Sequence, residues 1–224
     1  MNALLLIGSP KPKASASRSF GEALVTRLAV RGAQARTARV APAFESAETL
    51  GRLLDEIGWA DLVVLSFPVY VDSLPAPVMR LLEAWADGGP SRLAPGGSTR
   101  RLAVLTQCGF PEVTHCAVAI DVCRQFCREA GVEWAGALAF GMGGAIEGRP
   151  VERSPLARSI GAFDAAADAL MAGREIPEAA AQSVRRQLAP SWTYTMFGGL
   201  VWWWVARKRG VKGPLRLRRY AQPL

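Results

Sequence analysis

Four serines and three cationic side chains, but no acid, lie within residues 8–20, GSPKPKASASRSF. This stretch follows an apolar run at residues 3–7, and Gly8 permits a tight turn after that run. A helix is expected to begin near Ser17, whose hydroxyl suits the N-cap position. Hydroxyl groups, the unpaired N–H groups of a helix start and positive charge together favour a bound phosphate. These residues alone leave an alternative open, a polar loop that only caps the helix.

The same stretch lacks two well-known nucleotide-binding patterns. The Walker pattern GxxxxGK[ST] is absent, and a single glycine cannot form the GxGxxG turn that binds dinucleotides. A monophosphate held by hydroxyl groups therefore fits this loop better.

An aromatic side chain follows another apolar run, as the serine-rich stretch follows the run at residues 3–7. In SFPVYVDSLPAPVMRLLEAW, residues 66–85, Tyr70 comes at the expected end of a strand. Pro75 and Pro77 then open an amphipathic helix, with Asp72 or Ser73 as its expected cap.

Strand and helix patterns alternate along the chain. Continuous apolar runs are typical of strands covered on both faces, and five such βα units predict a parallel sheet in an open three-layer α/β sandwich. In a sheet ordered 2-1-3-4-5, ligands bind at the carboxyl ends of the strands where the order reverses, so the loops after strands 1, 3 and 4 should form the site. The expected strands are 3–7, 34–40 (polar enough for an edge), 62–67, 102–106 and 134–140; the expected helices are 17–31, 45–58, 75–87, 113–130 and 155–173, with a long surface loop at 87–97.

The net charge of +8 belongs to the C-terminal part of the chain. The last acid is Glu178, and nine of the 27 Lys and Arg follow it, so residues 1–178 carry 18 basic against 19 acidic side chains. A near-neutral body argues against a nucleic-acid binder. We therefore expect no nucleic-acid partner.

The four cysteines, Cys108, Cys116, Cys123 and Cys127, lack the close CxxC pairs of a zinc or iron–sulfur site. The last three fall on one face of a helix, so we expect small buried side chains and no metal. The N-terminal apolar run is short and has no basic leader, which does not fit a signal peptide. These features predict a reducing, cytoplasmic location.

Taken together, these stretches resemble the flavodoxin-like family of NAD(P)H-dependent FMN reductases and quinone reductases. The matching pieces are GSPKPKASASRS, PVYVDSLPAPVMRLLEAW, TQCGFPE and GMGG, each after an expected strand. None is specific alone, but all four occur in the family's order. The resemblance implies a flavodoxin-like three-layer sandwich that binds FMN over residues 1–174. Residues 175–224 would then form a helical, Trp-rich and basic C-terminal extension.

The resemblance also implies which loops contact FMN. The first would grip the phosphate, the second would contact the isoalloxazine ring with Tyr70 stacked on it, and the third would border the pyrimidine side of the ring. Residues 141–144 would border the face open to a nicotinamide. No catalytic side chain is assigned, because the flavin itself carries the chemistry. The implied cofactor-binding residues are Ser9, Lys11, Ser15, Ser17, Arg18, Ser19, Pro68, Val69, Tyr70, Val71, Gln107, Cys108, Gly109 and Phe110.

Two further side chains near this region are expected to have minor roles. Cys108 is expected to contact the cofactor through its backbone only. His115, the single histidine, is expected at the surface, because the sequence suggests no partner that would orient it for proton transfer.

The activity implied is that of an FMN-dependent oxidoreductase that takes hydride from NAD(P)H and passes electrons to a quinone, a flavin or a similar small acceptor. A flavodoxin-type electron carrier without direct NAD(P)H oxidation is the alternative, although such carriers are usually strongly acidic and this body is neutral. A basic nucleic-acid or membrane-binding module would explain only the tail. The resemblance and an aromatic C-terminal arm also favour a homodimer.

That arm is the stretch WTYTMFGGLVWWWVARKRG, residues 192–210. Its apolar part is shorter than the roughly 18 residues needed to cross a bilayer. Because large exposed apolar patches are unusual, we expect the arm to pack on its own domain or on a partner subunit. The alternative is a peripheral membrane contact, since tryptophans beside Arg207, Lys208 and Arg209 fit an interfacial anchor on anionic lipid.

Overall fold

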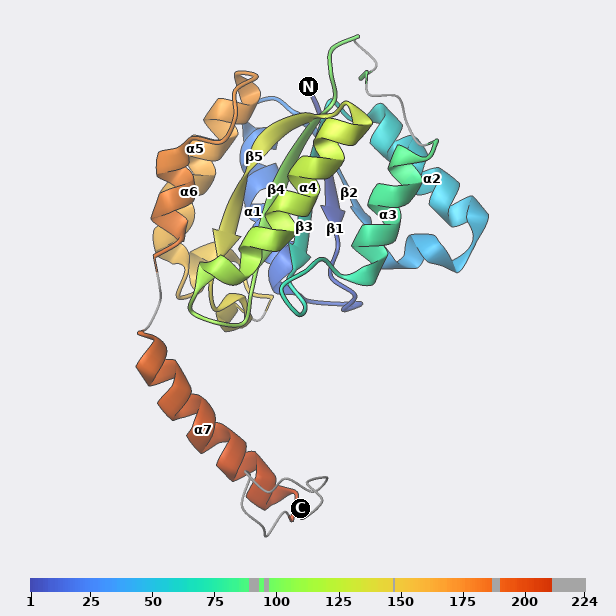
Figure 1. Cartoon of the computed structure of the whole chain (residues 1–224). Helices are drawn as coiled ribbons and strands as arrows, with labels where there is room; N and C mark the ends of the chain where they lie inside the picture. Colours follow the sequence, from blue (N-terminus) through green and yellow to red (C-terminus); the bar gives the residue numbers. More distant parts are fainter. Residues whose placement is uncertain (89–92, 95–96, 147, 187–189, 211–224) are drawn as a thin grey trace. The chain divides into compact units, whose positions relative to one another are not determined.

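The computed structural model describes residues 1–88, 93–94, 97–146, 148–186 and 190–210. Five parallel strands form one sheet in the order β2-β1-β3-β4-β5 (Figure 1). Both the strand positions and their order confirm the sequence prediction. The strands are β1 (Asn2–Ile7), β2 (Gln34–Arg39), β3 (Leu62–Pro68), β4 (Arg101–Gln107) and β5 (Glu133–Phe140).

Helices cover both faces of the sheet, which is why the central strands β3 and β4 are buried along nearly their whole length. Short 3₁₀ turns join several of the elements. The helices of this layer structure are α1 (Ala16–Val30), α2 (Ala47–Trp59), α3 (Ala76–Ala86), α4 (Ala117–Ala130), α5 (Ile160–Met171) and α6 (Glu178–Val184). The 3₁₀ turns are η1 (Ala41–Glu45), η2 (Val113–Cys116), η3 (Gly143–Ile146), η4 (Val151–Arg153) and η5 (Ala157–Ser159).

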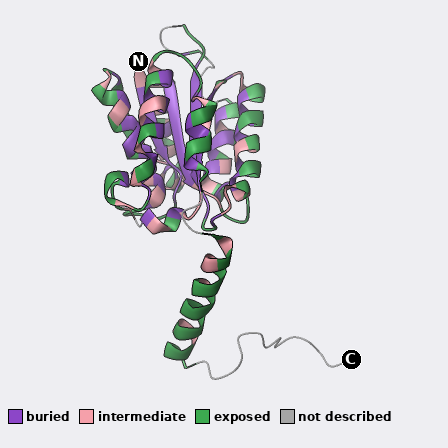
Figure 2. Cartoon of the chain, turned by 90° about the vertical axis from the view of Figure 1, so that its left-hand side faces the viewer, coloured by how far each residue is buried: buried purple, intermediate pink, exposed green. Residues whose placement is uncertain are grey.

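Alternate residues of β1, β3, β4 and β5 belong to two separate cores, because successive side chains point to opposite faces of a sheet. Leu5 and Ile7 of β1 pack with α1, α5 and α6, whereas Leu4 and Leu6 pack with α2, α3 and α4. Figure 2 shows the strands as the most continuously buried part of the chain. The sheet is thus a rigid platform whose strand ends can hold loops in fixed positions.

The predicted cap of α3 is wrong. Neither Asp72 nor Ser73 caps this helix; Pro75 occupies the N-cap position, and no side chain bonds to the first turn. The physical reason is that Tyr70 and Ser73 close a tight turn of their own. Pro75 and Pro77 suffice to start the helix, because proline fixes φ at a helical value.

The first compact unit runs from Met1 to Leu188 and is therefore longer than the predicted domain of residues 1–174. The segment after residue 174 belongs to the core, since Ile176, Ala181 and Val184 are buried among α1, α5 and β5. The backbone N–H of Ile176 also donates to the carbonyl of Ala135 at 2.9 Å. Helix α6 is thus part of the sandwich.

The second unit, Ala189–Leu224, is described here by itself. Its helix α7 (Ser191–Lys208) has no buried residue. Among the helices of the described residues, none has both the length and the hydropathy for a membrane span. The predicted surface loop at 87–97 lies partly outside the described residues, as does most of the basic tail after α7.

Candidate functional site

Four loops meet at the carboxyl ends of β1, β3, β4 and β5 and enclose a cavity of about 170 Å³. This is the edge of the sheet at which the strand order reverses, as the sequence predicts. Nine of the predicted cofactor-binding residues line this cavity. Its lining consists of Ser9, Lys11, Ser15, Ala16, Pro68, Val69, Tyr70, Gln107, Cys108, Gly109, Gly143 and Gly144.

The hydroxyl of Ser15 caps α1, and the prediction that Ser17 does so is wrong. Ser15 Oγ accepts a hydrogen bond from the backbone N–H of Arg18 at 3.2 Å. Ser9 Oγ likewise accepts from the N–H of Lys11 at 3.4 Å. No acidic residue lies in the first turn of α1, so the positive end of the helix faces the cavity without a competing carboxylate.

Ser17 and Ser19 point into the protein. Ser17 is fully buried, and its Oγ accepts a hydrogen bond from Nε2 of Gln107 at 3.0 Å. Ser19 Oγ donates to the carbonyl of Ser15 at 3.3 Å within the helix. Neither of these two side chains lines the cavity. Ser17 instead holds the side chain of Gln107, which does line it.

Gly8 is needed for space rather than for a positive φ. A Cβ atom at this position would lie 2.5 Å from Cγ2 of Val78 and 2.8 Å from Cβ of Phe67. The first loop can therefore pass close to β3 and α3 only because Gly8 has no side chain.

Arg18 and Arg39 both make hydrogen bonds to residues of the first loop. The guanidinium of Arg18 pairs with Glu22 on the same helix at 3.2 Å, so this predicted site residue contributes to the cap through its backbone. Arg39 donates from Nη2 to the carbonyl of Lys11 at 3.1 Å. Sequence reasoning missed Arg39, although β2 was expected to pair with β1 and to end at the same edge.

The second loop holds Tyr70 beside the cavity through a strained turn. Tyr70 and Ser73 exchange backbone hydrogen bonds of 3.0 and 3.1 Å. The two residues between them, Val71 and Asp72, both have positive φ, 51° and 56°. Such a turn normally takes asparagine or glycine, and a β-branched residue is strained there. Tyr70 is half exposed and lines the cavity, whereas Val71 is fully exposed and does not.

We expect the variant Val71→Gly to be more stable than the wild type by about 1 kcal/mol, because glycine adopts positive φ without a steric penalty. Urea unfolding measures this difference. The control is Val118→Gly, an exposed position in α4, which should lose roughly 0.5 kcal/mol because glycine disfavours helices. A Val71→Gly protein no more stable than the wild type would contradict the strain at this turn.

The third loop presents the amide of Gln107 at the cavity. Gln107 is 5% exposed, and its Oε1 has no hydrogen-bond partner among the described residues. A buried acceptor without a partner is costly in a folded protein and often marks a ligand site. Gly143 packs directly on this side chain, since a Cβ there would lie 2.2 Å from Cγ of Gln107.

Backbone hydrogen bonds tie the loops after β4 and β5 together. Cys108 donates to the carbonyl of Phe140 at 3.1 Å, Gly143 to that of Cys108 at 2.9 Å, and Met142 to that of Phe110 at 2.8 Å. A Cβ at Gly141 would lie 2.4 Å from the carbonyl oxygen of Pro111. The GMGG stretch is thus held against the third loop, and Gly143 and Gly144 reach the cavity.

The cysteines are buried, which confirms the prediction for Cys116, Cys123 and Cys127. Cys108 is also buried, and its Sγ lies 3.3 Å from the carbonyl oxygens of both Phe110 and Glu112. A hydrogen bond with Cys116 lowers the pKa of the Cys108 thiol, whereas the same bond and burial raise the pKa of Cys116. Of the two thiols, Cys108, which lines the cavity, is therefore the one that loses its proton more readily.

His115 has a partner that the sequence did not reveal. Its Nδ1 lies 2.8 Å from Oδ1 of Asp72 in the strained turn, and its ring centroid lies 4.8 Å from that of Phe110. The expectation of a histidine without an orienting group is wrong, because folding brings the second and third loops together. Phe110 is half exposed and lies outside the cavity lining.

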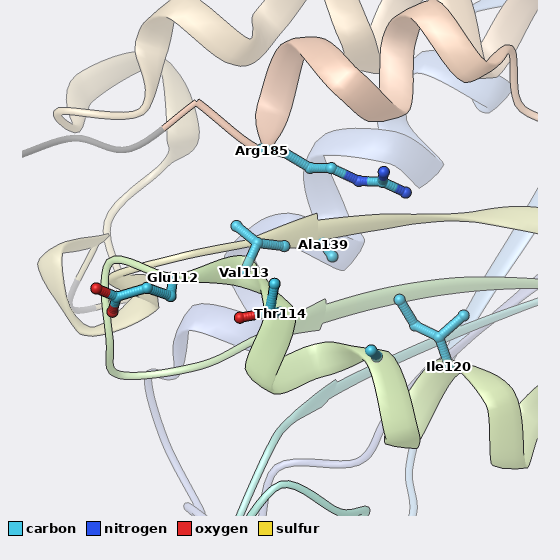
Figure 3. A pocket seen from close by; sticks show the side chains of 7 residues that line it. Glu112, Val113, Thr114, Ile120, Ala139 and Arg185 are labelled. Carbon is cyan, nitrogen blue, oxygen red and sulfur yellow. The ribbon is translucent and has the colours of Figure 1, made fainter.

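A larger cavity, of about 420 Å³, lies between α4, β5 and the end of α6. Figure 3 shows Arg185 reaching in from α6 on one side of the cavity and Thr114 and Ile120 on another. No predicted site residue lines it, and its walls are mostly apolar. The smaller cavity is therefore the candidate site, because polar groups from separate strand ends converge there.

The strand order and the helices on both faces of the sheet define a flavodoxin-like α/β protein. The family model described as Flavodoxin-like fold matches residues 1–112, half of the chain. The chain therefore belongs to this family. No curated protein sequence matches the chain significantly.

Solved structures with the same fold include two oxidoreductases and a flavodoxin. An NADH:FMN oxidoreductase in its apo form is 17% identical with a TM-score of 0.56, and the match covers 84% of this chain and 96% of that one. An NAD(P)H:quinone oxidoreductase from Methanothermobacter marburgensis is 20% identical with a TM-score of 0.50 over 73% and 98%. A flavodoxin from Streptococcus pneumoniae TIGR4 is 14% identical with a TM-score of 0.53 over 77% and 99%. At these identities the likeness establishes the fold.

Proposed function

We propose that this protein is an FMN-dependent oxidoreductase that takes hydride from NAD(P)H and passes electrons to a quinone, a flavin or a similar small acceptor. The observation that carries the proposal is that three loops line the same cavity. The first loop contributes hydroxyl groups and a lysine, the second contributes Tyr70 and the third contributes Gln107. An NADH:FMN oxidoreductase and an NAD(P)H:quinone oxidoreductase among the structural neighbours are consistent with it.

The residues of the cavity fit the two ends of FMN. Ser9, Ser15 and Lys11 offer hydroxyl groups and a positive charge at the start of α1, which suits a dianionic phosphate. Gln107 Oε1 is a buried acceptor without a partner in the described part of the chain, which suits an N–H group of a heterocyclic ring. Tyr70 is exposed enough to lie against a flat ring.

Each loop then has a separate task. The first loop fixes the phosphate and so sets the position of the ligand along the sheet edge. The turn at Tyr70 and the Gln107 amide orient the ring, and Ser17 keeps that amide in place through its hydrogen bond. Bound FMN would supply the chemistry of hydride transfer and electron transfer. The chain then needs only to position and shield it.

The alternative, a flavodoxin-type electron carrier, predicts the same cavity but no reaction with nicotinamide nucleotides. Electron carriers of this type dock through strongly acidic surfaces, whereas residues 1–178 of this chain are close to neutral. This charge balance favours the reductase.

One experiment separates the two functions. The purified protein, reconstituted with FMN, is mixed with NADPH or with NADH in the absence of oxygen, and the visible flavin band is recorded. We expect the band to bleach with at least one of the two nucleotides. A band indifferent to both indicates the carrier, and failure to take up FMN rejects both flavin functions.

A further inference from the structure

Helix α7 presents apolar side chains on every side. Val201, Trp202, Trp203 and Trp204 are consecutive and all exposed, and four successive residues cover the circumference of a helix. Phe197 and Leu200, one turn earlier, are exposed as well. Figure 2 shows this helix as almost entirely exposed. A helix that is apolar all round is stable only where it contacts an apolar partner or medium.

Both threonine hydroxyl groups of α7 are satisfied at the start of the helix. Thr193 Oγ1 donates to the carbonyl of Pro190 at 2.6 Å, and Thr195 Oγ1 donates to that of Ser191 at 3.0 Å. Polar groups that bond inside their own helix can enter an apolar medium without an unpaired donor. The threonines therefore do not oppose contact with a lipid or another apolar phase.

Positive charge is confined to the C-terminal end of α7. Residues 191–206 carry no charge, and Arg207, Lys208 and Arg209 follow directly. Arg207 lies over the ring of Trp203 and Lys208 over that of Trp204, each 4.4 Å from the ring centroid. Tryptophan next to cations is the combination found where apolar and charged regions of a membrane meet.

The whole second unit lacks a negative side chain to balance these cations. Residues 189–224 contain seven Lys and Arg but no Asp or Glu, while residues 1–178 are near neutral. The same helix of a second copy would bring more positive charge to the contact, and the first unit of a second copy offers no excess of negative charge. Nucleic acid would match the charge but not the uncharged body of α7. An anionic lipid surface matches both.

We propose that α7 and its cationic end dock this protein on an anionic lipid surface. The tryptophans enter the boundary between headgroups and acyl chains, and Arg207, Lys208 and Arg209 contact the lipid phosphates and carboxylates. The docking is peripheral and reversible, and it depends on salt because charge supplies much of the attraction. It is independent of whether the first unit is a reductase.

The test is co-sedimentation of the full-length protein with vesicles of phosphatidylcholine, with and without phosphatidylserine, at low and at high salt. We expect tight binding only to the vesicles that contain phosphatidylserine, and weaker binding at high salt. The variant R207Q/K208Q/R209Q should bind about 100-fold more weakly, since each cation contributes roughly fivefold near an anionic surface. The variant W202A/W203A/W204A should lose more than about tenfold.

The matched control is R52Q/R124Q/R128Q, which removes three exposed cations from the first unit and causes the same change in net charge. It should bind vesicles as the wild type does, within about twofold. The proposal would be overturned if the protein did not bind anionic vesicles, or if the control lost as much vesicle affinity as R207Q/K208Q/R209Q. It would also be overturned if vesicle binding were absent and analytical ultracentrifugation showed an oligomer that the tryptophan variant abolishes. Binding to duplex DNA that is stronger than to these vesicles would also overturn it.

Discussion

The variant Ser15→Asp is expected to bind FMN at least about 100-fold more weakly than the wild type while remaining folded. Aspartate caps helices as well as serine does, so α1 keeps its first turn. At the same time a carboxylate replaces a hydroxyl that lines the cavity. The phosphate loses a hydrogen bond worth about 1.5–3 kcal/mol and gains a like charge, which costs up to about 4 kcal/mol at 4 Å.

Titration of apo-protein with FMN, followed by quenching of flavin fluorescence, measures the affinity. The matched control is Ser46→Asp, because Ser46 caps α2 in the same way, accepting from the N–H of Thr49 at 3.1 Å, and does not line the cavity. Both variants should unfold within about 1 kcal/mol of the wild type. Unchanged FMN affinity in Ser15→Asp would remove the start of α1 from the phosphate site.

The variant Gly143→Ala is expected to lose about 1–3 kcal/mol of stability, the range found for overpacked interiors. The new Cβ would lie 2.2 Å from Cγ and 2.7 Å from Cβ of Gln107. Gln107 cannot simply swing away, because Ser17 holds its amide and the surroundings are buried. Displacing that amide should also weaken FMN binding by about tenfold, because the ring loses a well-placed acceptor.

The neighbouring variant Gly144→Ala serves as the control. Gly144 lines the same cavity, but a Cβ there meets no atom within 4 Å. Thermal unfolding should therefore leave Gly144→Ala within about 0.5 kcal/mol of the wild type. If the two variants prove equally stable, the close packing of Gly143 on Gln107 is not as the structure has it.

Local sequence patterns were sufficient to predict the three layers of helices and strands in this protein. The runs ALLLI and LVVLSF could be identified as buried strands because a strand covered on both faces must be apolar throughout. Alternation with helices then fixed a parallel sheet, and crossover handedness left few strand orders. The positions of the site loops followed, since parallel strands end at one edge.

Roles within those loops were harder to predict. The sequence offers serines at positions 15, 17 and 19 with equal chemistry, but helix geometry turns only Ser15 toward the cavity and turns Ser17 toward Gln107. The contact between His115 and Asp72 joins two loops that are 43 residues apart. No local pattern encodes such a contact, because it depends on how the sheet aligns β3 with β4.

By itself, then, the sequence determined the elements, the family and the chemical character of each loop, because these depend on hydrophobic periodicity and residue type along a short stretch. Only the tertiary structure decided which hydroxyl caps α1, that Arg39 reaches the first loop, and that Gly143 packs against the side chain of Gln107. The cap depends on the residue at which α1 begins. The other two depend on the distance between atoms that different strands position, and the packing of the whole sheet sets that distance.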